Sequence, residues 1–502
     1  MNILTAKDMH EWDRYTMVHE PVSSIGLMER AAHACTTWIM AHVPAGSSFK
    51  IFCGRGNNGG DGLAIARQLH EHGYNVDAYT LKGDRPGSAD FEANAARWQK
   101  IAPLTILSSP EDFPALEKTD IVIDALVGTG LSEPLRGLTA ELVQYINNVE
   151  IRVIAIDLPS GINTDGSSKE NTVVHAQTTL TFQLYKLGLL LAENGPFIGH
   201  VEILDIGLHP GFLKARVFNQ QLVDRPVIDE IYRPRKPYAH KGNFGHALLL
   251  AGSYGKMGAA VLAARACLHA GAGLLTTAIP RCGYNIMQTS VPEAMALPDT
   301  EEELLAHLPD GLDKYNVIGI GPGIGTAGPT KALLASLLEN YKRPLVIDAD
   351  ALNCLAQEKE LLEKLPPFSI FTPHPKEFDR LFGEQPNEMA RIQTAQQQAR
   401  EKNIIIVLKG AHTLVATPTG KSYFNSTGNA GMAKGGSGDV LTGIITALLA
   451  QQYPPVQAAI LGVYLHGLAG DLAARAHSQE AMTATDLTVF LGAAFLQLKG
   501  PK

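Results

Sequence analysis

Three short segments in the first half of the chain combine glycine with carboxylate, amide or hydroxyl side chains directly after an apolar run. Residues 54–62 read Gly-Arg-Gly-Asn-Asn-Gly-Gly-Asp-Gly, and the other two segments are residues 124–130 and 157–161. Glycines at a strand end let the backbone turn sharply and approach a ligand, and a following helix offers free N–H groups to a phosphate. A carboxylate beside such a turn could act as acid or base, or hold a cation through oxygen.

The polar side chains of these segments are expected to lie close together. In an open parallel sheet the ligand crevice lies at the carboxyl ends of the strands, where Asn58, Asp124, Asp157 and Ser160 would meet. Each aspartate alone could equally be a helix N-cap or a turn residue, and a glycine-rich turn without a ligand explains an isolated G-x-G-x-x-G match equally well. The three strand ends taken together favour a binding or catalytic site.

The second half of the chain has a longer glycine-rich segment, residues 429–439, which reads Asn-Ala-Gly-Met-Ala-Lys-Gly-Gly-Ser-Gly-Asp and runs into a predicted helix. Its glycines, among them Gly438, would aim backbone N–H groups at an anion, and the helix would add its N-terminal dipole. Asp439 could then take a proton from a hydroxyl near the phosphates, which combines an anion hole with a base. Asp439 could instead only cap the helix, but the surrounding glycines make that the weaker interpretation.

Two further strand ends of the second half suit nucleotide phosphates or a substrate. The predicted strand at residues 404–408 is followed by Lys409, Gly410, Ala411, His412 and Thr413, a segment that suits nucleotide phosphates. His412 taken alone would more often be a surface loop residue. No G-x-x-x-x-G-K-[ST] motif is present, so the chain is not a P-loop enzyme. His374 follows another strand and stands between two prolines; it is either a substrate contact, which we favour, or a turn residue.

The elements that must position these residues alternate between strand and helix patterns. Helical spacing of apolar residues comes first, followed by strands separated by helices, which is typical of βαβ units and a mostly parallel sheet. The expected strands are residues 49–53, 76–81, 121–127, 151–157, 178–184, 201–205, 246–251, 274–279, 317–320, 345–348, 369–372 and 404–408. The expected helices include residues 11–18, 25–43, 258–270, 439–452, 456–476 and 485–498.

A less regular stretch, residues 208–244, separates the first series of alternating strands and helices from the second. It contains four prolines and a basic cluster of Arg233, Arg235 and Lys236, which we interpret as a solvated linker. A chain of 502 residues exceeds the size at which one core stops growing, so at least two domains are expected. The sequence therefore predicts two domains of the α/β class in series, residues 1–220 and 221–502.

Composition narrows the functional classes. The formal net charge is -8, which argues against a nucleic-acid-binding role. Five widely spaced cysteines without a CxxC pair support neither a zinc site nor a disulfide framework, and reduced thiols suit a cytoplasmic protein. The N-terminus does not look like a signal peptide, and the most apolar stretch, residues 440–450, is too short to span a membrane. Apolar helices at the chain end could form an interface, and we expect a homo-oligomer.

Over residues 1–207 these motifs together resemble the N-terminal domain of the YjeF family, the epimerase domain for hydrated NAD(P)H, or NAD(P)HX. The resemblance implies a Rossmann-like three-layer fold and a potassium ion near Asn58, Asp124 and Ser160. It implies that Asp157 moves a proton at the hydrated carbon, and it places Lys186 where the family usually has a lysine, although a surface or strand-end charge would explain Lys186 too. The implied substrate contacts are Asn57, Asn58, Gly59, Gly60, Asp61, Gly128, Thr129, Gly130, Leu131, Ser132, Glu133, Pro134 and Asp157.

Residues 241–492 resemble the ribokinase-like superfamily, and more closely its ADP-dependent NAD(P)HX dehydratase branch. The segments that carry this resemblance are residues 240–242, 258–260, 271–273, 321–323, 372–377, 409–410 and 435–439. Two small departures are Ala430 and Lys434, where the family more usually has Pro and Thr. The implied contacts to the hydrated cofactor are Ala259, Gly323, His374 and Asp439. Residues 409–413 and Gly438 would hold the adenine nucleotide, with Mg²⁺ screening its phosphates.

The order of the two domains matches that of a fused bacterial repair enzyme. We therefore expect a bifunctional enzyme that epimerises R- and S-NAD(P)HX and dehydrates the S form to NAD(P)H, converting ADP to AMP and phosphate. One alternative is an ATP-dependent small-alcohol kinase with a ligand-binding N-terminal module; a stable phosphorylated product would support it. Another is a non-catalytic N-terminal binding or scaffolding module. The preference for ADP over ATP, and for NADHX over NADPHX, stays open at this stage.

Overall fold

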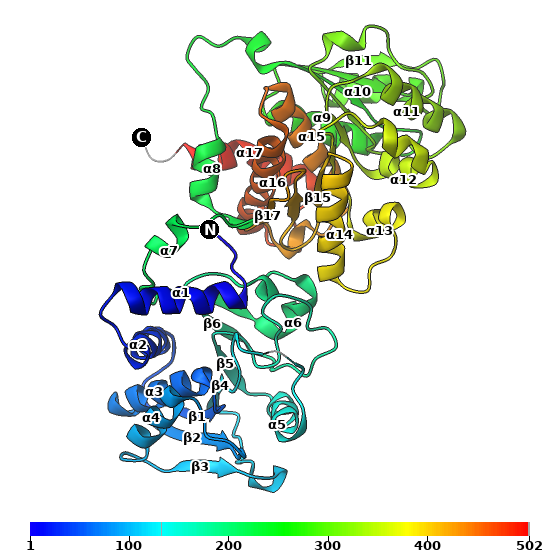
Figure 1. The fold of residues 1–502 in the computed structure, drawn as a ribbon. Helices are drawn as coiled ribbons and strands as arrows, with labels where there is room; N and C mark the ends of the chain where they lie inside the picture. The colour runs from blue at the N-terminus through cyan, green and yellow to red at the C-terminus, as the bar shows by residue number, and fades with distance from the viewer. Residues whose placement is uncertain (132, 500–502) are drawn as a thin grey trace. The chain divides into compact units, whose positions relative to one another are not determined.

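The computed structural model describes residues 1–131 and 133–499, which form two compact units. The N-terminal unit comprises Asn2–Phe218 together with Asn387–Met389. The C-terminal unit comprises Met1, Asn219–Pro386 and the chain from Ala390 onward. Each unit is built around its own sheet with helices packed on it (Figure 1). Both units are of the α/β class, as the alternating pattern predicts.

The N-terminal unit contains a seven-stranded sheet in the order β3-β2-β1-β4-β5-β6-β7, with every pair parallel. Its strands are β1 Ser48–Cys53, β2 Asn75–Leu81, β3 Leu104–Leu107, β4 Asp120–Ala125, β5 Arg152–Ile156, β6 Thr178–Phe182 and β7 His200–Leu204. Its helices are α1 Ala6–His19, α2 Ser24–His42, α3 Asn57–Glu71, α4 Ala89–Trp98, α5 Gly137–Asn147, α6 Gly195–Ile198 and α7 Gly211–Lys214. The chain proceeds outward from β1 to β3 and then returns to β4 on the other side of β1. This reversal makes the carboxyl ends of β1 and β4 the expected ligand crevice of a Rossmann-like sheet.

The period-2 alternation of the strands produces the three layers of this unit. Ile51 and Cys53 of β1 face α3, because a Cβ added to Gly62 of α3 would touch both side chains. Phe52, between them, belongs instead to the core cluster that α5 completes through Leu142. Helices α2, α3 and α4 pack against one another, so one helical layer covers each face of the sheet.

The glycines of residues 54–62 allow the first turn of α3 to approach the end of β1. A Cβ on Gly59 would lie 1.6 Å from the Gly54 carbonyl oxygen, and a Cβ on Gly54 would lie 1.8 Å from the Leu126 carbonyl oxygen. No other residue fits at either position without moving the backbone. Helix α3 therefore begins at the motif itself, at Asn57, with its free N–H groups at the strand end.

The C-terminal unit contains a ten-stranded sheet in the order β11-β10-β9-β12-β13-β14-β15-β16-β17-β8. Its strands are β8 Gln220–Val223, β9 His246–Leu250, β10 Leu274–Ile279, β11 Met295–Pro298, β12 Val317–Ile320, β13 Leu345–Ile347, β14 Ile370–Phe371, β15 Ile405–Leu408, β16 Leu414–Ala416 and β17 Ser422–Asn425. Its helices are α8 Arg225–Ile231, α9 Met257–His269, α10 Tyr284–Ser290, α11 Gly328–Asn340, α12 Ala349–Gln357, α13 Pro375–Phe382, most of α14 Glu388–Glu401, α15 Ser437–Ala450, α16 Pro455–His477 and α17 Ala484–Leu498. The sheet is parallel from β11 to β15, and β16 pairs antiparallel with both β15 and β17.

The interpretation of residues 208–244 as an irregular linker is wrong for part of that stretch. Residues 220–223 form β8, which pairs in parallel with β17 at the edge of the sheet, and residues 225–231 form α8. Strand β8 has only four residues, so its apolar pattern is too short to stand out beside Pro226. The basic cluster that follows is exposed, although Arg235 stacks on Phe244 at 3.8 Å from the ring centroid.

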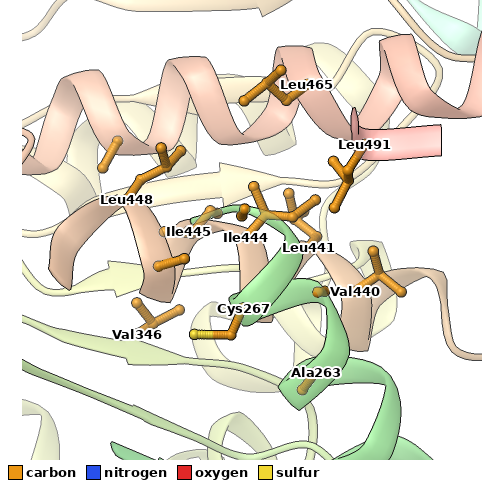
Figure 2. Packing of buried hydrophobic residues seen from close by; sticks show 14 of the residues in the cluster. Ala263, Cys267, Val346, Val440, Leu441, Ile444, Ile445, Leu448, Leu465 and Leu491 are labelled. Carbon is orange, nitrogen blue, oxygen red and sulfur yellow. The ribbon is translucent and has the colours of Figure 1, made fainter. Parts of the chain in front are cut away.

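The largest core lies in the C-terminal unit, where α15 packs against α9, α16 and α17. Figure 2 shows side chains of these helices gathered in one cluster, with Ile444 among them. A Cβ on Gly443 would lie 2.2 Å from the Ala263 carbonyl oxygen, so α15 and α9 touch through their backbones. Helix α16 alone among the described residues has the length and hydropathy of a membrane span, and 67% of its apolar window is buried within the protein. The apolar composition of α16 therefore agrees with its burial in this core.

Removing side-chain volume from this core should cost stability. Ile444 is fully buried, and Ile444→Ala is expected to lower the free energy of unfolding of the C-terminal unit by about 3 kcal/mol, through lost apolar burial and a residual cavity. Calorimetry that resolves the two unfolding transitions would measure this change. The control is Val489→Ala on α17, where the side chain is 62% exposed and little change is expected. Equal effects of the two substitutions would contradict the placement of this core.

Candidate active sites

A cavity of about 330 Å³ opens in the N-terminal unit beside the ends of β1 and β5. Several residues selected from the sequence line it, namely Asn57, Asp61, Thr129, Asp157 and Lys186. The other lining residues come mainly from α1 and α2: Met9, His10, Asp13, Arg14, Met17, Ser24, Leu27, Met28, Ala31, Asp90, Phe182 and Ile206. The cavity is therefore polar on the side of the strand ends and largely apolar on the side of α2.

The centre of the cavity is an ion pair between Asp157 and Lys186, whose Oδ1 and Nζ atoms lie 2.8 Å apart. Lys186 is 1% exposed and also donates to Thr181 Oγ1 and the Phe182 carbonyl oxygen, each at 2.8 Å. The second oxygen of Asp157 accepts from the Thr129 N–H at 3.2 Å. All three donors of the lysine ammonium are thus used, and both carboxylate oxygens are held. Lys186 is not a surface charge, in contrast to the alternative reading of the sequence.

Asp157 also has a strained backbone. Its φ is +66°, in the left-handed region that disfavours residues other than glycine. Such strain persists only where the surroundings impose it, and it concentrates at functional sites. Here the hydrogen bond from the Asp157 N–H to the Leu180 carbonyl, at 2.8 Å, fixes the residue at the end of β5. The turn directs the carboxylate toward the cavity and away from the sheet.

A second polar cluster lies behind this pair. Asp124 is completely buried and accepts hydrogen bonds from Ser160 N at 2.7 Å, Ser160 Oγ at 2.6 Å and Leu126 N at 3.2 Å. Burial raises the pKa of Asp124 to about 6, although these hydrogen bonds oppose the shift. The side-chain amide of Asn58 lies 3.2 Å from both the Ile156 carbonyl oxygen and the Gly128 N–H. The structure thus brings Asn58, Asp124 and Ser160 to one strand-end region.

Two further carboxyl groups line the cavity. Asp61 of α3 is buried, and burial together with the charge of Asp157 raises its pKa well above the ordinary value. Asp13 of α1 was not selected from the sequence; burial raises its pKa to about 6. The signal that could have found Asp13 is its position on the buried stripe of α1, next to Trp12 and three residues before Thr16. A carboxylate on such a stripe is unusual, and it therefore marks a candidate site residue.

The remaining residues selected for this site lie around it with less definite roles. Gly59 and Gly60 form the start of α3 under the loop, and Gly128 contacts both Asp157 and Asn58. Gly130, Leu131, Glu133 and Pro134 continue the loop after β4 and are not among the residues that line the cavity. Ser132 lies outside the described residues.

In the C-terminal unit, polar residues from several strand ends meet beside α15. Lys409, after β15, lies 3.0 Å from Asp348 Oδ1 and 3.9 Å from Glu377 Oε2. Asp348, after β13, is 1% exposed and also accepts from Thr442 Oγ1 at 2.7 Å. Lys409 was selected from the sequence as a site residue, whereas Asp348 and Glu377 were not. An aspartate directly after a fully buried strand was the available signal for Asp348.

Asp439 stands at the start of α15. Helix α15 begins after Gly436, whose φ of +92° requires glycine, and Asp439 is in its first turn. Among the described residues the Asp439 side chain makes no hydrogen bond or ion pair, so it makes no capping bond to the helix. Burial, followed by the nearby charge of Asp348, raises the pKa of Asp439 to about 7. The adjacent Gly438 lies over Lys409, whose Nζ would be 3.1 Å from a Cβ there.

The three other residues selected as contacts to the hydrated cofactor form the rest of this region. Gly323 has a φ of +67°, and a Cβ there would lie 3.2 Å from the Ala259 Cβ, so these two residues are adjacent. His374 caps α13 through Nδ1, which accepts from Lys376 N at 3.1 Å and Glu377 N at 3.3 Å. On the opposite edge of the ring, Nε2 lies 3.3 Å from Glu377 Oε1, so both ring nitrogens face groups of α13. Burial and the charge of Lys409 lower the pKa of His374, so the ring is neutral near pH 7.

Residues 409–413 form the tight turn between β15 and β16. Thr413 Oγ1 donates to the Gly410 carbonyl at 3.1 Å and accepts from its N–H at 3.3 Å. Ala411 is exposed. His412 is half-buried, with Nδ1 3.0 Å from the Asn425 carbonyl oxygen, so it packs against β17 and is not a free loop residue. In the described part of the chain no group of three or more His, Cys, Asp or Glu side chains is arranged to hold a metal ion.

Comparison with known proteins finds a match for each of the two units. Residues 24–188 match the family described as YjeF-related protein N-terminus, and residues 247–491 match the family described as NAD(P)H-hydrate dehydratase. The bifunctional NAD(P)H-hydrate repair enzyme Nnr of Moorella thermoacetica is 39% identical over 98% of this chain and 96% of its own length. The Nnr enzyme of Escherichia coli is 33% identical over 92% of this chain and 87% of its own.

Two solved structures resemble the C-terminal unit. The ADP/ATP-dependent NAD(P)H-hydrate dehydratase of Bacillus subtilis, co-crystallised with ATP and Mg²⁺, is 31% identical, with a TM-score of 0.50 over 56% of this chain and 100% of that one. A ribokinase-like superfamily protein of Enterococcus faecalis is 29% identical, with a TM-score of 0.51 over 57% of this chain and 99% of that one. These neighbours confirm the ribokinase-like fold of the C-terminal unit. The similarity over nearly the whole length shows that this chain belongs to the family of bifunctional NAD(P)H-hydrate repair enzymes.

Proposed function

We propose that the N-terminal unit interconverts the R and S epimers of NADHX and NADPHX, and that the C-terminal unit dehydrates the S epimer to NAD(P)H with ADP as phosphoryl donor. The observation that carries the proposal is the C-terminal arrangement, in which Asp439, whose side chain has no partner among the described residues, stands in the first turn of α15 near Lys409. The N-terminal cavity with its Asp157–Lys186 pair supports the other half. A small-alcohol kinase is not better supported, because the relatives named as repair enzymes match both units.

Dehydration requires the enzyme to convert a poor leaving group into a good one. Asp439 takes the proton from the substrate hydroxyl while the hydroxyl oxygen attacks the terminal phosphorus of ADP. This step releases AMP and leaves a phosphate ester on the substrate. Elimination of phosphate, with loss of a proton from the neighbouring carbon, then restores the ring double bond. Lys409 and the N–H groups before α15 stabilise the charge that moves between the oxygens. Mg²⁺ carried by the nucleotide phosphates would screen their charge.

Epimerisation at the hydrated carbon requires a base that can take a proton from the substrate. Asp157 faces the cavity with both carboxylate oxygens held, one by Lys186 and one by the Thr129 N–H. This anchoring fixes the orientation of a base, because the carboxylate cannot rotate without breaking one bond. Lys186 acts on Asp157 as a positioning residue. The first turn of α3, at Asn57, would receive the phosphates of the substrate.

The cluster behind Asp157 fits a potassium ion. Asp124 is completely buried and has no cationic side chain as a partner among the described residues, so its charge is not balanced within the unit. Around it stand oxygen ligands of Ser160, the Asn58 amide and the nearby Ile156 carbonyl. A bound monovalent cation would balance the carboxylate and hold the loop after β4 in place. Potassium accepts such a set of oxygen ligands, and no step of the reaction needs the ion itself.

The cation proposal predicts a dependence of the epimerase on K⁺. Exchange of K⁺ for tetramethylammonium, which is too large for an oxygen-lined site, is expected to lower epimerisation at least tenfold and to lower the melting temperature of the N-terminal unit. Dehydration of pure S-NADHX serves as the internal control, because its site lies in the other unit. Asp124→Asn should abolish the response of the melting temperature to K⁺. An unchanged response in Asp124→Asn would contradict this site.

The two activities can be tested in one assay. An epimer mixture of NADHX is incubated with the protein and Mg²⁺, together with ADP, with ATP or with neither, and the return of the absorbance of reduced nicotinamide is followed. Full recovery with ADP is expected, because the epimerase supplies the S form as it is consumed. Partial recovery would mean that the dehydratase works without the epimerase. No recovery with either nucleotide, together with phosphorylation of a small alcohol, would establish the kinase instead.

A further inference from the structure

Asp13 lines the same cavity as the Asp157–Lys186 pair, and its side chain has no partner in the described part of the chain. It lies on α1 and lines the same cavity as Asp157. Among residues 1–131 and 133–499 it makes no hydrogen bond and no ion pair. Asp157, in contrast, has both oxygens held. Besides Asp61 and Asp90, the cavity thus contains the anchored Asp157 and the Asp13 carboxyl group, which no described residue holds.

The surroundings of Asp13 favour its protonated form. Burial is the largest effect, the charge of Asp157 acts in the same direction, and Lys186 and His10 act against both, with a resulting pKa of about 6. The other charged groups that line the cavity are Arg14 on α1, Asp61 on α3 and Asp90 on α4. Asp61 and Asp90 bring the carboxyl groups of the cavity to four, and Lys186 is already fully bonded. A carboxyl group without a partner, in the same cavity as a carboxyl group anchored by a lysine, is an arrangement that suits an acid and a base.

We propose that Asp13 is a second catalytic residue of the epimerase site, which gives a proton to the ring nitrogen of the substrate while Asp157 takes one from the adjacent hydroxyl. The inference rests on the proposed epimerase activity. In a nicotinamide hydrate the carbon that carries the hydroxyl is bonded to the ring nitrogen. Deprotonation of the hydroxyl by Asp157 forms a carbonyl, the carbon–nitrogen bond breaks, and its electron pair takes the proton of Asp13.

The ring then closes on the other face of the carbonyl. The nitrogen pair attacks the carbon, Asp13 regains its proton from the nitrogen, and the carbonyl oxygen regains its proton from Asp157. No atom is gained or lost, and neither an oxidant nor a second substrate is needed. The scheme requires one group that starts protonated and one that starts ionised. Asp157, held by the Lys186 ammonium, is placed to accept the hydroxyl proton, and Asp13, which lines the same cavity, is placed to supply the other proton.

The test uses the full-length protein with Asp439→Asn as the parent, so that no substrate is consumed by dehydration. A single purified epimer of NADHX is supplied, and the other epimer is followed by chromatography, with the spontaneous rate subtracted. The variants are Asp13→Asn, Asp13→Glu and, as a matched control, Glu11→Gln. Glu11 lies on the same helix and pairs with Arg216. Asp13→Asn is expected to lower kcat at least 100-fold with little change in KM.

The pH profile separates a proton donor from a structural residue. In the parent, kcat/KM should fall as the pH rises above about 6, because Asp13 loses the proton that it must donate. Asp13→Glu should keep this fall of kcat/KM at high pH and part of the activity, whereas Asp13→Asn should not show the fall. Glu11→Gln should match the parent in activity and in pH profile. An Asp13→Asn protein with parental kcat, or with a reduced kcat and an unchanged profile, would overturn the proposal. A parent that does not interconvert the epimers would overturn the epimerase function itself.

Discussion

Replacing Asp439 with asparagine is expected to lower kcat for dehydration of S-NADHX about 1,000-fold, because it removes the base that accepts the hydroxyl proton. KM should change little, since Asp439 makes no bond to any described residue that holds the site together. Steady-state initial rates of NADH formation from S-NADHX and ADP would give both constants. The control is Glu339→Gln, which removes an exposed carboxylate from α11 that pairs with Lys364. Parental turnover in Asp439→Asn would exclude Asp439 as the base.

The pH dependence of dehydration provides a second readout of the same prediction. Burial and Asp348 raise the pKa of Asp439 to about 7 in the free protein, and a base works only when ionised. The kcat/KM of dehydration should therefore rise with pH up to about 7 and level off above it. The epimerase should respond in the opposite direction, since Asp13 acts as an acid. If kcat/KM of dehydration rises with pH while kcat/KM of epimerisation falls in the same protein, each pH dependence can be assigned to its own unit.

Much of the fold could be predicted because strong local signals agree with the tertiary structure. Strands β1, β4 and β5 are buried on both faces and stand out as apolar runs, and the glycine-rich turns after them mark the strand ends. Strand β3 was missed because its four residues are partly exposed at the sheet edge. Short edge strands are stabilised by pairing, and pairing leaves little trace in periodicity.

The candidate sites show the same division. Asp157 and Asp439 could be selected because each follows or begins an element within a distinctive glycine-rich segment. Asp13 and Asp348 were not selected, because the local signal of each is weak and their surroundings come from distant segments. Asp13 lines the same cavity as Asp157, 144 residues further along, and Asp348 bonds Lys409 with a sequence separation of 61 residues. Lys186 was ranked low for a related reason. Its burial depends on three acceptors that no local pattern reveals.

The second large effect is expected at the Asp157–Lys186 pair, where catalysis and stability are coupled. Asp157→Asn should lower kcat for epimerisation about 1,000-fold, because an amide cannot take the hydroxyl proton. It should also destabilise the N-terminal unit by about 3 kcal/mol, because Lys186 is 1% exposed and would lose its only anionic hydrogen-bond partner among the described residues. Calorimetry and the epimer assay together would measure both effects.

A double substitution separates the two roles. In Asp157→Asn with Lys186→Met, no uncompensated charge stays buried, so the melting temperature of the N-terminal unit should recover much of the loss while epimerisation stays absent. The matched control is Asp77→Asn, which breaks the partly exposed pair with Lys50 on the same sheet and should cost less than about 1 kcal/mol. If stability and activity returned together in the double variant, Asp157 would be a structural residue, and the epimerase base would have to be sought among the other carboxyls of the cavity. If neither returned, the lysine would hold the strand end through its bonds to Thr181 and Phe182 more than through its charge.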